Sequence, residues 1–181
     1  MHITPLPLSG LVLFEPTVYQ DDRGFFLESY RQITMQQALG NVEFVQDNHS
    51  KSTKGTLRGL HFQSEPGQGK LVRCTQGAVW DVAVDLRPHS PTFRQWHALE
   101  LSQQNFLSIY IPVGFAHGFA VLTDVAEVQY KCTSYYNGAT EKGIAWNDPE
   151  LAINWPVDQP LLSARDQELP TLAQWLNQSA L

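Results

Sequence analysis

The sequence has 181 residues, of which 43% are hydrophobic and 17% are charged. This length and composition predict a single globular domain over residues 1–181 and exclude a disordered tail protein or a coiled coil. The 18 acidic residues outnumber the 12 basic ones and no basic stripe is visible, so we expect no nucleic-acid partner. No apolar run approaches the roughly 20 residues of a membrane-spanning helix, so we expect no membrane partner.

The N-terminus and the cysteines indicate a cytoplasmic protein. The first residues contain no basic leader and are interrupted by Pro5 and Pro7, so we expect no signal peptide. Cys74 and Cys132 lie in apolar, strand-like segments. We therefore expect reduced, buried thiols and no disulfide framework.

Helical periodicity is confined to two short segments. They are residues 33–39, which Gly40 follows, and the apolar stripe of Leu172, Trp175 and Leu176 after Pro170. Elsewhere, short apolar or alternating runs are separated by turn residues, and they predict strands over residues 42–48, 56–63, 70–75, 78–86, 107–111 and 126–136. Many short strands in one domain predict an all-β sandwich or barrel with a few short helices.

Two predicted strands have a clear alternating pattern. In residues 78–86 one face carries Ala78, Trp80, Val82, Val84 and Leu86.

In residues 126–136 one face carries Ala126, Val128, Tyr130, Cys132, Ser134 and Tyr136. Tyr130 and Tyr136 would lie about 20 Å apart on a straight strand, or closer if the chain bends near residues 137–138. They either fill the interior of a barrel or contact the two ends of an extended ligand.

Polar residues interrupt two segments that otherwise read as strands. In residues 57–63, His61 and Gln63 share a face and Arg58 is close by, more polar groups than a core strand normally carries. In residues 111–119 the spacing Pro-x-Gly-x-x-His ends at His117 and resembles the second motif of the cupin superfamily, whose fold is a double-sheeted β-barrel. A half-buried, hydrogen-bonded histidine is the simpler alternative for His61.

The metal-binding alternative depends on Gln63. Metal-binding cupins supply a His-x-His pair in their first motif, and here Gln63 stands two residues after His61. A site made of His61, Gln63 and His117 is conceivable because imidazole is a common ligand. The broken pair leads us to expect no metal.

Basic residues gather near the apolar strands, where they favour a local anionic ligand. They are Arg23, Arg58, Lys70, Arg73 and Arg165. A solvent-exposed position remains the alternative for Arg73. The glycines form neither a phosphate loop nor a dinucleotide fingerprint, and no Gly-x-Ser-x-Gly sequence occurs. We therefore expect no cofactor.

Ordered motifs run along nearly the whole chain. They are residues 23–28 (RGFFLE), 44–50 (FVQDNHS), 57–63 (LRGLHFQ), 69–72 (GKLV), 81–85 (DVAVD), 112–119 (PVGFAHGF), 130–131 (YK), 135–136 (YY), 146–148 (WND) and 162–166 (LSARD). Together they resemble the dTDP-4-dehydrorhamnose 3,5-epimerase family of cofactor-free, cupin-fold enzymes. The resemblance implies inversion of C3 and C5 of dTDP-4-dehydro-6-deoxy-D-glucose to give dTDP-4-dehydro-L-rhamnose.

The resemblance also implies a role for each matching residue. His61 would be the base, Asp166 its carboxylate partner and Tyr130 the acid on the opposite face of the sugar. Tyr136 would stack on the thymine, and Lys70 would stabilise the enolate. The full set of expected substrate contacts is Arg23, Glu28, Gln46, Asp47, Asn48, Arg58, Lys70, His117, Tyr136, Glu141 and Arg165.

Arg165 departs from the family pattern, because many members carry lysine there, and a planar guanidinium makes different contacts from an ammonium. The family further implies a homodimer that exchanges N-terminal strands. Three alternatives remain: an epimerase acting at C3 only or C5 only, a metal-dependent cupin isomerase or dioxygenase, and a non-catalytic sugar-nucleotide binding module.

Overall fold

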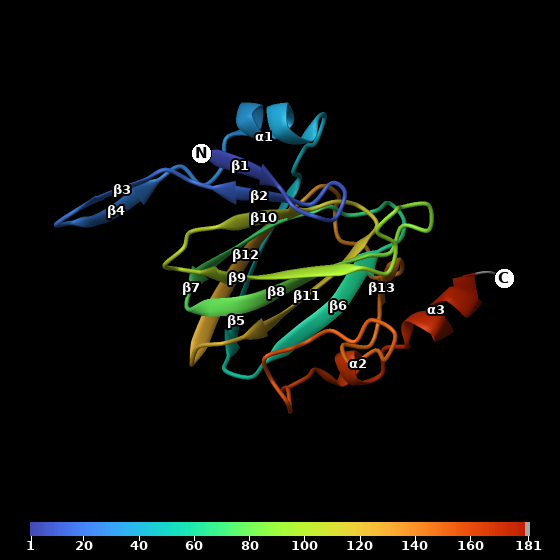
Figure 1. Cartoon of the computed structure of the whole chain (residues 1–181). Coiled ribbons are helices and arrows are strands. Elements are labelled where there is room, and N and C mark those ends of the chain that lie inside the picture. Colours follow the sequence, from blue (N-terminus) through green and yellow to red (C-terminus); the bar gives the residue numbers. More distant parts are fainter. Residues whose placement is uncertain (180–181) are drawn as a thin grey trace.

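The structure, a computed structural model, describes residues 1–179 (Figure 1), so the last two residues of the predicted domain lie outside the described part. The helices are α1 (Gln32–Leu39), α2 (Ala164–Gln167) and α3 (Leu172–Ser179). The strands are β1 (His2–Pro5), β2 (Val12–Glu15), β3 (Val18–Asp21), β4 (Gly24–Leu27), β5 (Gln46–Thr53), β6 (Leu57–Gln63), β7 (Lys70–Gln76), β8 (Ala78–Asp85), β9 (Trp96–Ser102), β10 (Ser108–Ile111), β11 (Phe115–Val121), β12 (Val125–Cys132) and β13 (Glu141–Gly143).

The strands form two large antiparallel sheets and a separate hairpin. The six-stranded sheet has the order β1-β2-β10-β7-β12-β5, and the five-stranded sheet has the order β13-β6-β11-β8-β9. The two sheets pack face to face in a cupin-type, double-sheeted barrel (Figure 1). The predicted all-β class with a few short helices is confirmed.

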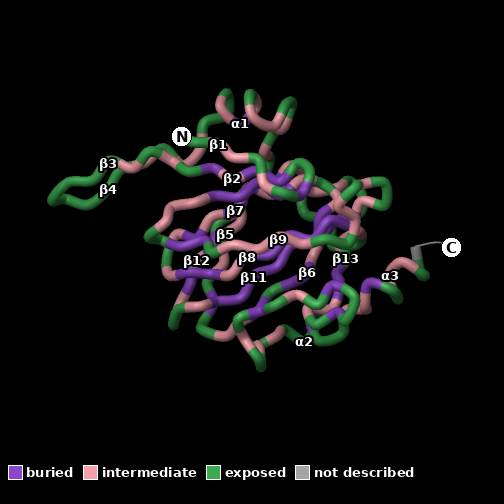
Figure 2. The backbone as a smooth tube through the Cα atoms, viewed as in Figure 1, coloured by how far each residue is buried: buried purple, intermediate pink, exposed green. Residues whose placement is uncertain are grey.

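The main core lies between the two sheets. Val72 of β7, Ile109 of β10 and Val128 of β12 meet Val79 of β8 and Phe119 of β11 in one buried cluster. Because side chains alternate along a strand, every second residue of these strands faces this interior. Figure 2 shows the buried stretches along the central strands. Removing this apolar area from water is the main stabilising contribution to the barrel.

The outer face of the five-stranded sheet is also buried, because the C-terminal segment covers it. Val82 and Val84 of β8 pack in a second cluster with Trp155 and with Leu172 of α3. The predicted common face of residues 78–86 is confirmed in this cluster. Its opposite face lines the barrel interior, which is why β8 reads as almost continuously apolar.

The helix predicted over residues 33–39 is confirmed as α1 within one residue, and the predicted apolar stripe of Leu172, Trp175 and Leu176 lies on α3. Helix α1 packs Met35 against Phe14 of β2 and Tyr110 of β10 on the outer face of the six-stranded sheet. Helix α3 begins after Thr171, whose hydroxyl accepts from the backbone N–H of Gln174 while the Gln174 side chain accepts from the backbone N–H of Thr171. This reciprocal capping box fixes the start of α3. The short helix α2 was not predicted.

The predicted strand over residues 42–48 is wrong in its position. The strand is β5, Gln46–Thr53, which pairs along its whole length with β12. Val42 and Phe44 instead pack against the cluster under α1. The apolar run therefore marked a contact with the helix and not a position in the sheet.

The predicted strand over residues 126–136 is wrong after Cys132, where β12 ends. The N–H of Thr133 still bonds to the carbonyl of Gly69 beside β7, but the backbone groups that follow bond to side-chain amides. Gln63 Nε2 donates to the carbonyl of Tyr135 and Gln63 Oε1 accepts from the N–H of Asn137, while Gln46 Oε1 accepts from the N–H of Tyr136. The chain consequently bends away from the sheet immediately after β12.

The β3–β4 hairpin projects away from the barrel (Figure 1). Its aromatic residues Tyr19, Phe25 and Phe26 are exposed.

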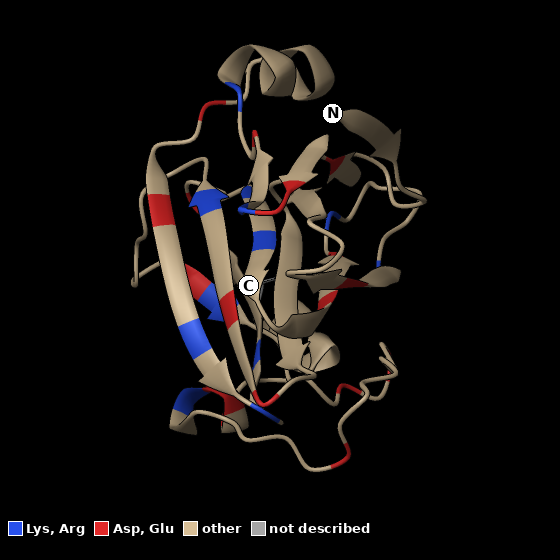
Figure 3. Cartoon of the chain, turned by 90° about the vertical axis from the view of Figure 1, so that its left-hand side faces the viewer, with Lys and Arg blue, Asp and Glu red and all other residues tan. Residues whose placement is uncertain are grey.

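In the view of Figure 3, basic and acidic residues are interspersed on the strands and loops. Both cysteines are free and buried, as predicted. Within residues 1–179, no helix is long and apolar enough to cross a membrane.

Candidate active site

One cavity of about 500 Å³ collects most of the side chains that the sequence singled out. Its walls come from both sheets and from the C-terminal segment around α2. This volume is typical of a site for a small organic ligand. The predicted site residues that line it are Asn48, Arg58, His61, Lys70, His117, Tyr130, Tyr136, Glu141, Arg165 and Asp166.

His61 and Asp166 form a hydrogen-bonded pair in this cavity. His61 Nε2 lies 2.5 Å from Asp166 Oδ1. The Asp166 side chain is 4% exposed, whereas that of His61 is 24% exposed, so the imidazole faces the cavity from in front of a buried carboxylate. The hydroxyl of Ser163, which caps α2, donates to Asp166 Oδ2, and this cap orients the carboxylate.

The protonation of Asp166 determines which nitrogen of His61 is basic. Burial raises the pKa of Asp166, but the hydrogen bonds from His61 and Ser163 and the charge of Arg165 outweigh it, and the pKa falls below its ordinary value. An ionised carboxylate can only accept hydrogen bonds. The proton of a neutral His61 therefore lies on Nε2, which leaves Nδ1 as the free base.

His117 lies beside His61, because the two are register partners on β11 and β6. The two strands approach closely where Gly59 and Gly118 meet: a Cβ on Gly59 would lie 2.6 Å from the Cα of Gly118. Gly59 also has φ +121°, a value that side chains disfavour. His117 Nε2 is bonded on its buried side to Asp81 Oδ2 at 2.8 Å.

Lys70 and Tyr130 come from the opposite wall. They lie on β7 and β12, neighbouring strands of the six-stranded sheet, so they face His61 across the cavity. Burial lowers the pKa of Lys70 below its ordinary value, although electrostatic interactions with Cys132, Glu141 and Asp81 act in the opposite direction. Burial also raises the pKa of Tyr130, which keeps its phenol protonated at neutral pH.

The mouth of the cavity is closed on one side by a charged cluster. Arg165 NH1 and the hydroxyl of Tyr136 both donate to Glu141 Oε2, at 2.5 and 2.8 Å. Burial raises the pKa of Glu141, but these two hydrogen bonds and the charge of Arg165 lower it below its ordinary value overall. The exposed ring of Tyr136 is thereby held at the edge of the cavity, with Tyr130 deeper inside.

Four predicted site residues do not line this cavity. Gln46 supports it indirectly through its bonds to Tyr136 and Asn48. Asp47 points to the outer face of the sheet, where Lys131 binds it.

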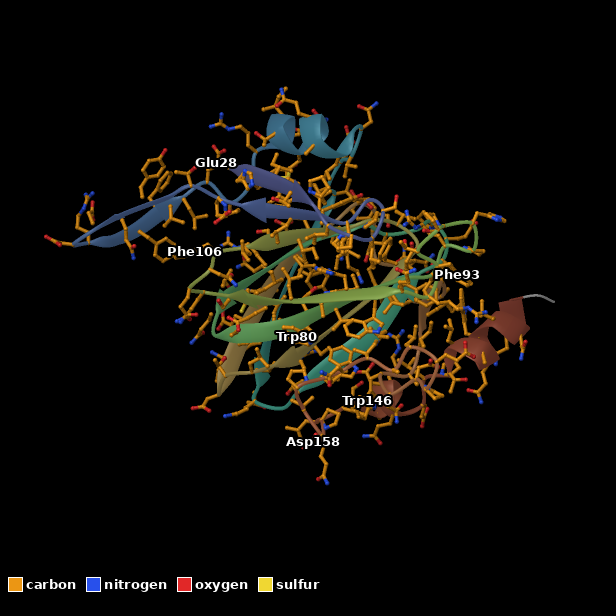
Figure 4. The ribbon with its side chains drawn as sticks, in the orientation of Figure 1. Glu28, Trp80, Phe93, Phe106, Trp146 and Asp158 are labelled. Carbon is orange, nitrogen blue, oxygen red and sulfur yellow. The ribbon has the colours of Figure 1, made fainter. Side chains whose placement is uncertain are left out.

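Arg23 lies on the projecting hairpin, paired with Asp21. Glu28 is paired with Arg31, and Figure 4 shows it beside the hairpin, on the other side of the molecule from Trp146.

The side chain of Gln63 stabilises the neighbouring loops and does not line the cavity. Its amide nitrogen donates to Pro66, Ser134 and Tyr135, and its oxygen accepts from Asn137. A metal site made of His61, Gln63 and His117 would have to break these bonds. Among residues 1–179, no three His, Cys, Asp or Glu side chains gather in a way that could hold a metal ion.

Sequence reasoning missed several cavity-lining residues. Gln68, whose side chain holds the carbonyl of Ser134, carries no local signal. Five of the missed residues stood inside motifs that had already been recognised, and their membership there could have indicated them: Ser50, Leu57, Phe119, Leu162 and Ser163. The remaining missed lining residues are Thr56 and Leu161.

A cupin-type barrel whose interior holds a histidine–carboxylate pair facing a half-buried lysine and tyrosine defines the chain as an acid–base enzyme of the cupin class. Comparison with known proteins then identifies the family. The family described as dTDP-4-dehydrorhamnose 3,5-epimerase matches residues 5–174. The chain belongs to this family, and the resemblance seen in the sequence is confirmed.

Three relatives illustrate the similarity. A dTDP-4-dehydrorhamnose 3,5-epimerase of Pseudomonas aeruginosa is 55% identical over 170 residues, covering 93% of this chain and 94% of the relative. The crystal structure of dTDP-6-deoxy-D-glucose-3,5-epimerase from Legionella pneumophila, in complex with dTDP-4-keto-L-rhamnose, is 47% identical with a TM-score of 0.92, covering 95% of this chain and 94% of that one. A dTDP-4-dehydrorhamnose 3-epimerase of Streptomyces niveus is 41% identical, covering 96% of this chain and 85% of the relative.

Proposed function

We propose that the chain inverts both C3 and C5 of dTDP-4-dehydro-6-deoxy-D-glucose, giving dTDP-4-dehydro-L-rhamnose. The observation that carries this proposal is the placement of His61 and Tyr130 on opposite walls of one cavity. Inversion at a carbon needs a base on one face and an acid on the other. Family membership supports the choice of substrate.

His61 is the base. The C4 ketone acidifies the hydrogens at C3 and C5, and the free Nδ1 of His61 accepts one of these protons. The electron pair of the broken C–H bond moves into an enolate whose charge rests on the C4 oxygen. The carboxylate of Asp166, at Nε2, then stabilises the imidazolium that has formed.

Lys70 and Tyr130 complete the reaction from the opposite wall. The ammonium of Lys70 offers positive charge to the enolate oxygen, and burial strengthens this attraction because it removes competing water. The phenol of Tyr130 delivers a proton to the opposite face of the carbon and is reprotonated from solvent, while the His61 imidazolium releases its proton to solvent and is again a free base. Each inversion therefore exchanges a carbon-bound hydrogen with water and needs no further reactant.

The other cavity residues are proposed as substrate contacts. Arg58, held by its bond to Ser52, and the neighbouring Asn48 bind the sugar diphosphate, and His117 contacts the sugar beside His61. Tyr136, with Glu141 and Arg165 beside it, receives the thymine at the mouth. The whole chain acts as one catalytic domain of a cytoplasmic enzyme, which the two free, buried cysteines support.

We further propose that the enzyme is a homodimer in which the N-terminal strands are exchanged. Arg23 and Glu28 lie outside their own chain's cavity, and the hairpin that carries Arg23 exposes aromatic residues to solvent. A second copy would receive this hairpin at the mouth of its cavity and bury those rings. Its site would then gain a guanidinium for the diphosphate.

An epimerase that acts at C3 alone is the second candidate, favoured by the similarity to the Streptomyces niveus 3-epimerase. Proton NMR of the product separates the two, because ring coupling constants report the configuration at each carbon. Inversion at both carbons is expected, with His61→Asn as the inactive control. A product inverted only at C3 would establish the second candidate, and an unchanged sugar would refute both.

A further inference from the structure

A second histidine–carboxylate pair lies at the wall of the cavity, and the proton transfers described above do not use it. His117 Nε2 lies 2.8 Å from Asp81 Oδ2. This pair is more deeply buried than His61–Asp166, since the side chains of His117 and Asp81 are 7% and 0% exposed. Asp81 lies behind His117 and does not itself line the cavity.

Asp81 occupies a position on β8 at which an apolar core residue is expected. On β8 the residues two before and two after it, Val79 and Ala83, are buried core residues between the sheets, and β-strand alternation places Asp81 among them. One carboxylate oxygen, Oδ1, is buried with no hydrogen-bond partner in the described residues. A buried carboxylate of this kind costs stability, so a merely structural role does not explain it.

The geometry determines which side of His117 faces the ligand. Asp81 occupies Nε2, and no described residue bonds to the other ring nitrogen, Nδ1. His117 lines the cavity and is the register partner of His61, and such partners have Cα atoms only about 5 Å apart. A donor on His117 therefore reaches the same part of the substrate that His61 deprotonates.

We propose that Asp81 is a positioning residue, which fixes the His117 ring from behind so that Nδ1–H donates to the C4 oxygen of the substrate while the enolate forms. This inference rests on the proposed function. The enolate oxygen then interacts with Lys70 on the wall of the six-stranded sheet and with His117 on the wall of the five-stranded sheet. With Nε2 donating to the Asp81 carboxylate, the ring donates from Nδ1 as well only when both of its nitrogens carry a proton.

The charge of Asp81 also acts on Lys70. Burial lowers the pKa of Lys70, and Asp81 is among the charges that oppose this effect. A neutral residue at position 81 would alter the hydrogen bond that fixes the His117 ring and, as a smaller effect, remove one of the charges that favour the ammonium of Lys70. We therefore expect substitution of Asp81 to slow the chemical step and to leave nucleotide binding unchanged.

The test compares Asp81→Asn with Asp85→Asn. Asp85 is a matched control, because it is a fully buried carboxylate on the same strand, bonded to Arg87, and it does not line the cavity. For each variant we would measure kcat, dTDP affinity and thermal stability. Asp81→Asn should lower kcat about 10- to 100-fold with dTDP affinity within about twofold, whereas Asp85→Asn should lower Tm with kcat unchanged.

A double-mutant cycle shows whether Asp81 acts through His117. In a His117→Asn background, Asp81→Asn should lower kcat by less than about threefold further. The role of Asp81 is overturned if Asp81→Asn retains kcat within twofold of the parent. It is also overturned if the fold-decrease in kcat of the double variant equals the product of the fold-decreases of the two single variants. It is equally overturned if kcat, dTDP affinity and Tm all fall together.

A measurement on the unsubstituted protein needs neither turnover nor a folded variant. Nitrogen-15 NMR of the histidine rings should find protons on both Nδ1 and Nε2 of His117. A His117 ring with no proton on Nδ1 would overturn the proposal. Activity of the parent is the separate test of function: a parent that inverts neither carbon refutes the proposed function, whereas an active parent with an equally active Asp81→Asn variant refutes only the role of Asp81.

Discussion

His61 has a buried side and an exposed side, and this asymmetry determines how it transfers a proton. Asp166 and Ser163 are fixed behind it by the cap of α2, so Nε2 is occupied and Nδ1 is the nitrogen that remains free. On the other wall, burial raises the pKa of Tyr130. A phenol with a raised pKa donates its proton only to a strong base, and an enolate is such a base.

Replacement of Tyr130 should separate proton exchange from inversion. In Tyr130→Phe the base can still remove a proton and return it to the same face, but delivery to the opposite face loses its donor. Net inversion should fall by about 10²- to 10⁴-fold, while deuterium exchange from D2O falls much less. The two rates are read from the same sample by NMR and mass spectrometry. Equal losses of both rates would contradict the role of Tyr130 as the acid.

At the scale of elements, residues 133–137 place Tyr136 at the mouth of the cavity. Three side-chain amides hold this segment in place of a sheet ladder, and Glu141 binds the Tyr136 hydroxyl. The segment therefore presents one tyrosine to the cavity while its neighbour, Tyr135, remains exposed and outside the lining.

Tyr136→Ala should weaken dTDP binding by about 1–3 kcal/mol, the loss expected when a base loses its stacking partner. Tyr135→Ala is the matched control and should leave the affinity within twofold. Isothermal titration calorimetry with dTDP measures both. Comparable losses in the two variants would mean that the segment, and not the Tyr136 ring, determines affinity.

The last residue of β8, Asp85, is a carboxylate whose contribution to stability depends on pH. Burial raises the pKa of Asp85, but hydrogen bonds from Arg87, Ser90 and Thr92 outweigh it and lower the pKa from 3.8 to about 2. Because the folded-state pKa is below the unfolded one, the contribution is present above about pH 4 and is lost as the pH falls toward 2. The shift corresponds to about 2 kcal/mol.

Asp85→Asn should therefore lower the free energy of unfolding by about 2 kcal/mol at pH 7. The difference from the parent should shrink between pH 4 and pH 2, where the parent loses the same contribution. Urea unfolding at a series of pH values measures it. A difference that stays constant over this range would show that the charge of Asp85 is not what stabilises the turn.

Local patterns predicted the elements whose structure depends on local interactions. The alternation of residues 78–86 predicted a strand of the core, and Gly40 marked the end of α1. The end of β12 could not be predicted, since it depends on amides of Gln63, Gln68 and Gln46, distant in sequence. The short strands β1 to β4 were missed because they are half-exposed and carry no sustained alternation.

In the site, too, local patterns predicted some residues, whereas residues that depend on contacts distant in sequence could not be predicted from them. Polar residues inside the β6 and β11 segments indicated His61 and His117 from local pattern alone. Asp166, 105 residues from His61, was indicated only by family resemblance, because no local pattern reports a contact at that separation. The resemblance did not assign a role to Asp81, whose bond to His117 emerges only from the packing of β8 against β11.

At the scale of the whole molecule, the exchange of hairpins between two copies makes a specific prediction. His61→Asn and Arg23→Ala should each inactivate a homodimer. In a mixed dimer, the site that retains His61 receives an intact Arg23 from the partner, so one site of the two works. Statistical mixing should restore roughly a quarter of the parent activity.

Co-expression of the two variants, followed by an assay of the mixture, measures this recovery. The control pairs His61→Asn with Asp166→Asn, because both changes fall in the same chain's cavity and neither partner can correct the other. No recovery in the first mixture would contradict the exchange of hairpins.

The central claim is that one cofactor-free cavity exchanges the hydrogens at both C3 and C5. The most direct measurement is mass spectrometry of dTDP-4-dehydro-6-deoxy-D-glucose after incubation with the protein in D2O, with chelator present and no metal added. The account predicts two deuterium atoms per sugar, one at each acidified carbon. A single deuterium would reveal an epimerase acting at one carbon, and no incorporation would contradict the roles assigned to His61 and Tyr130.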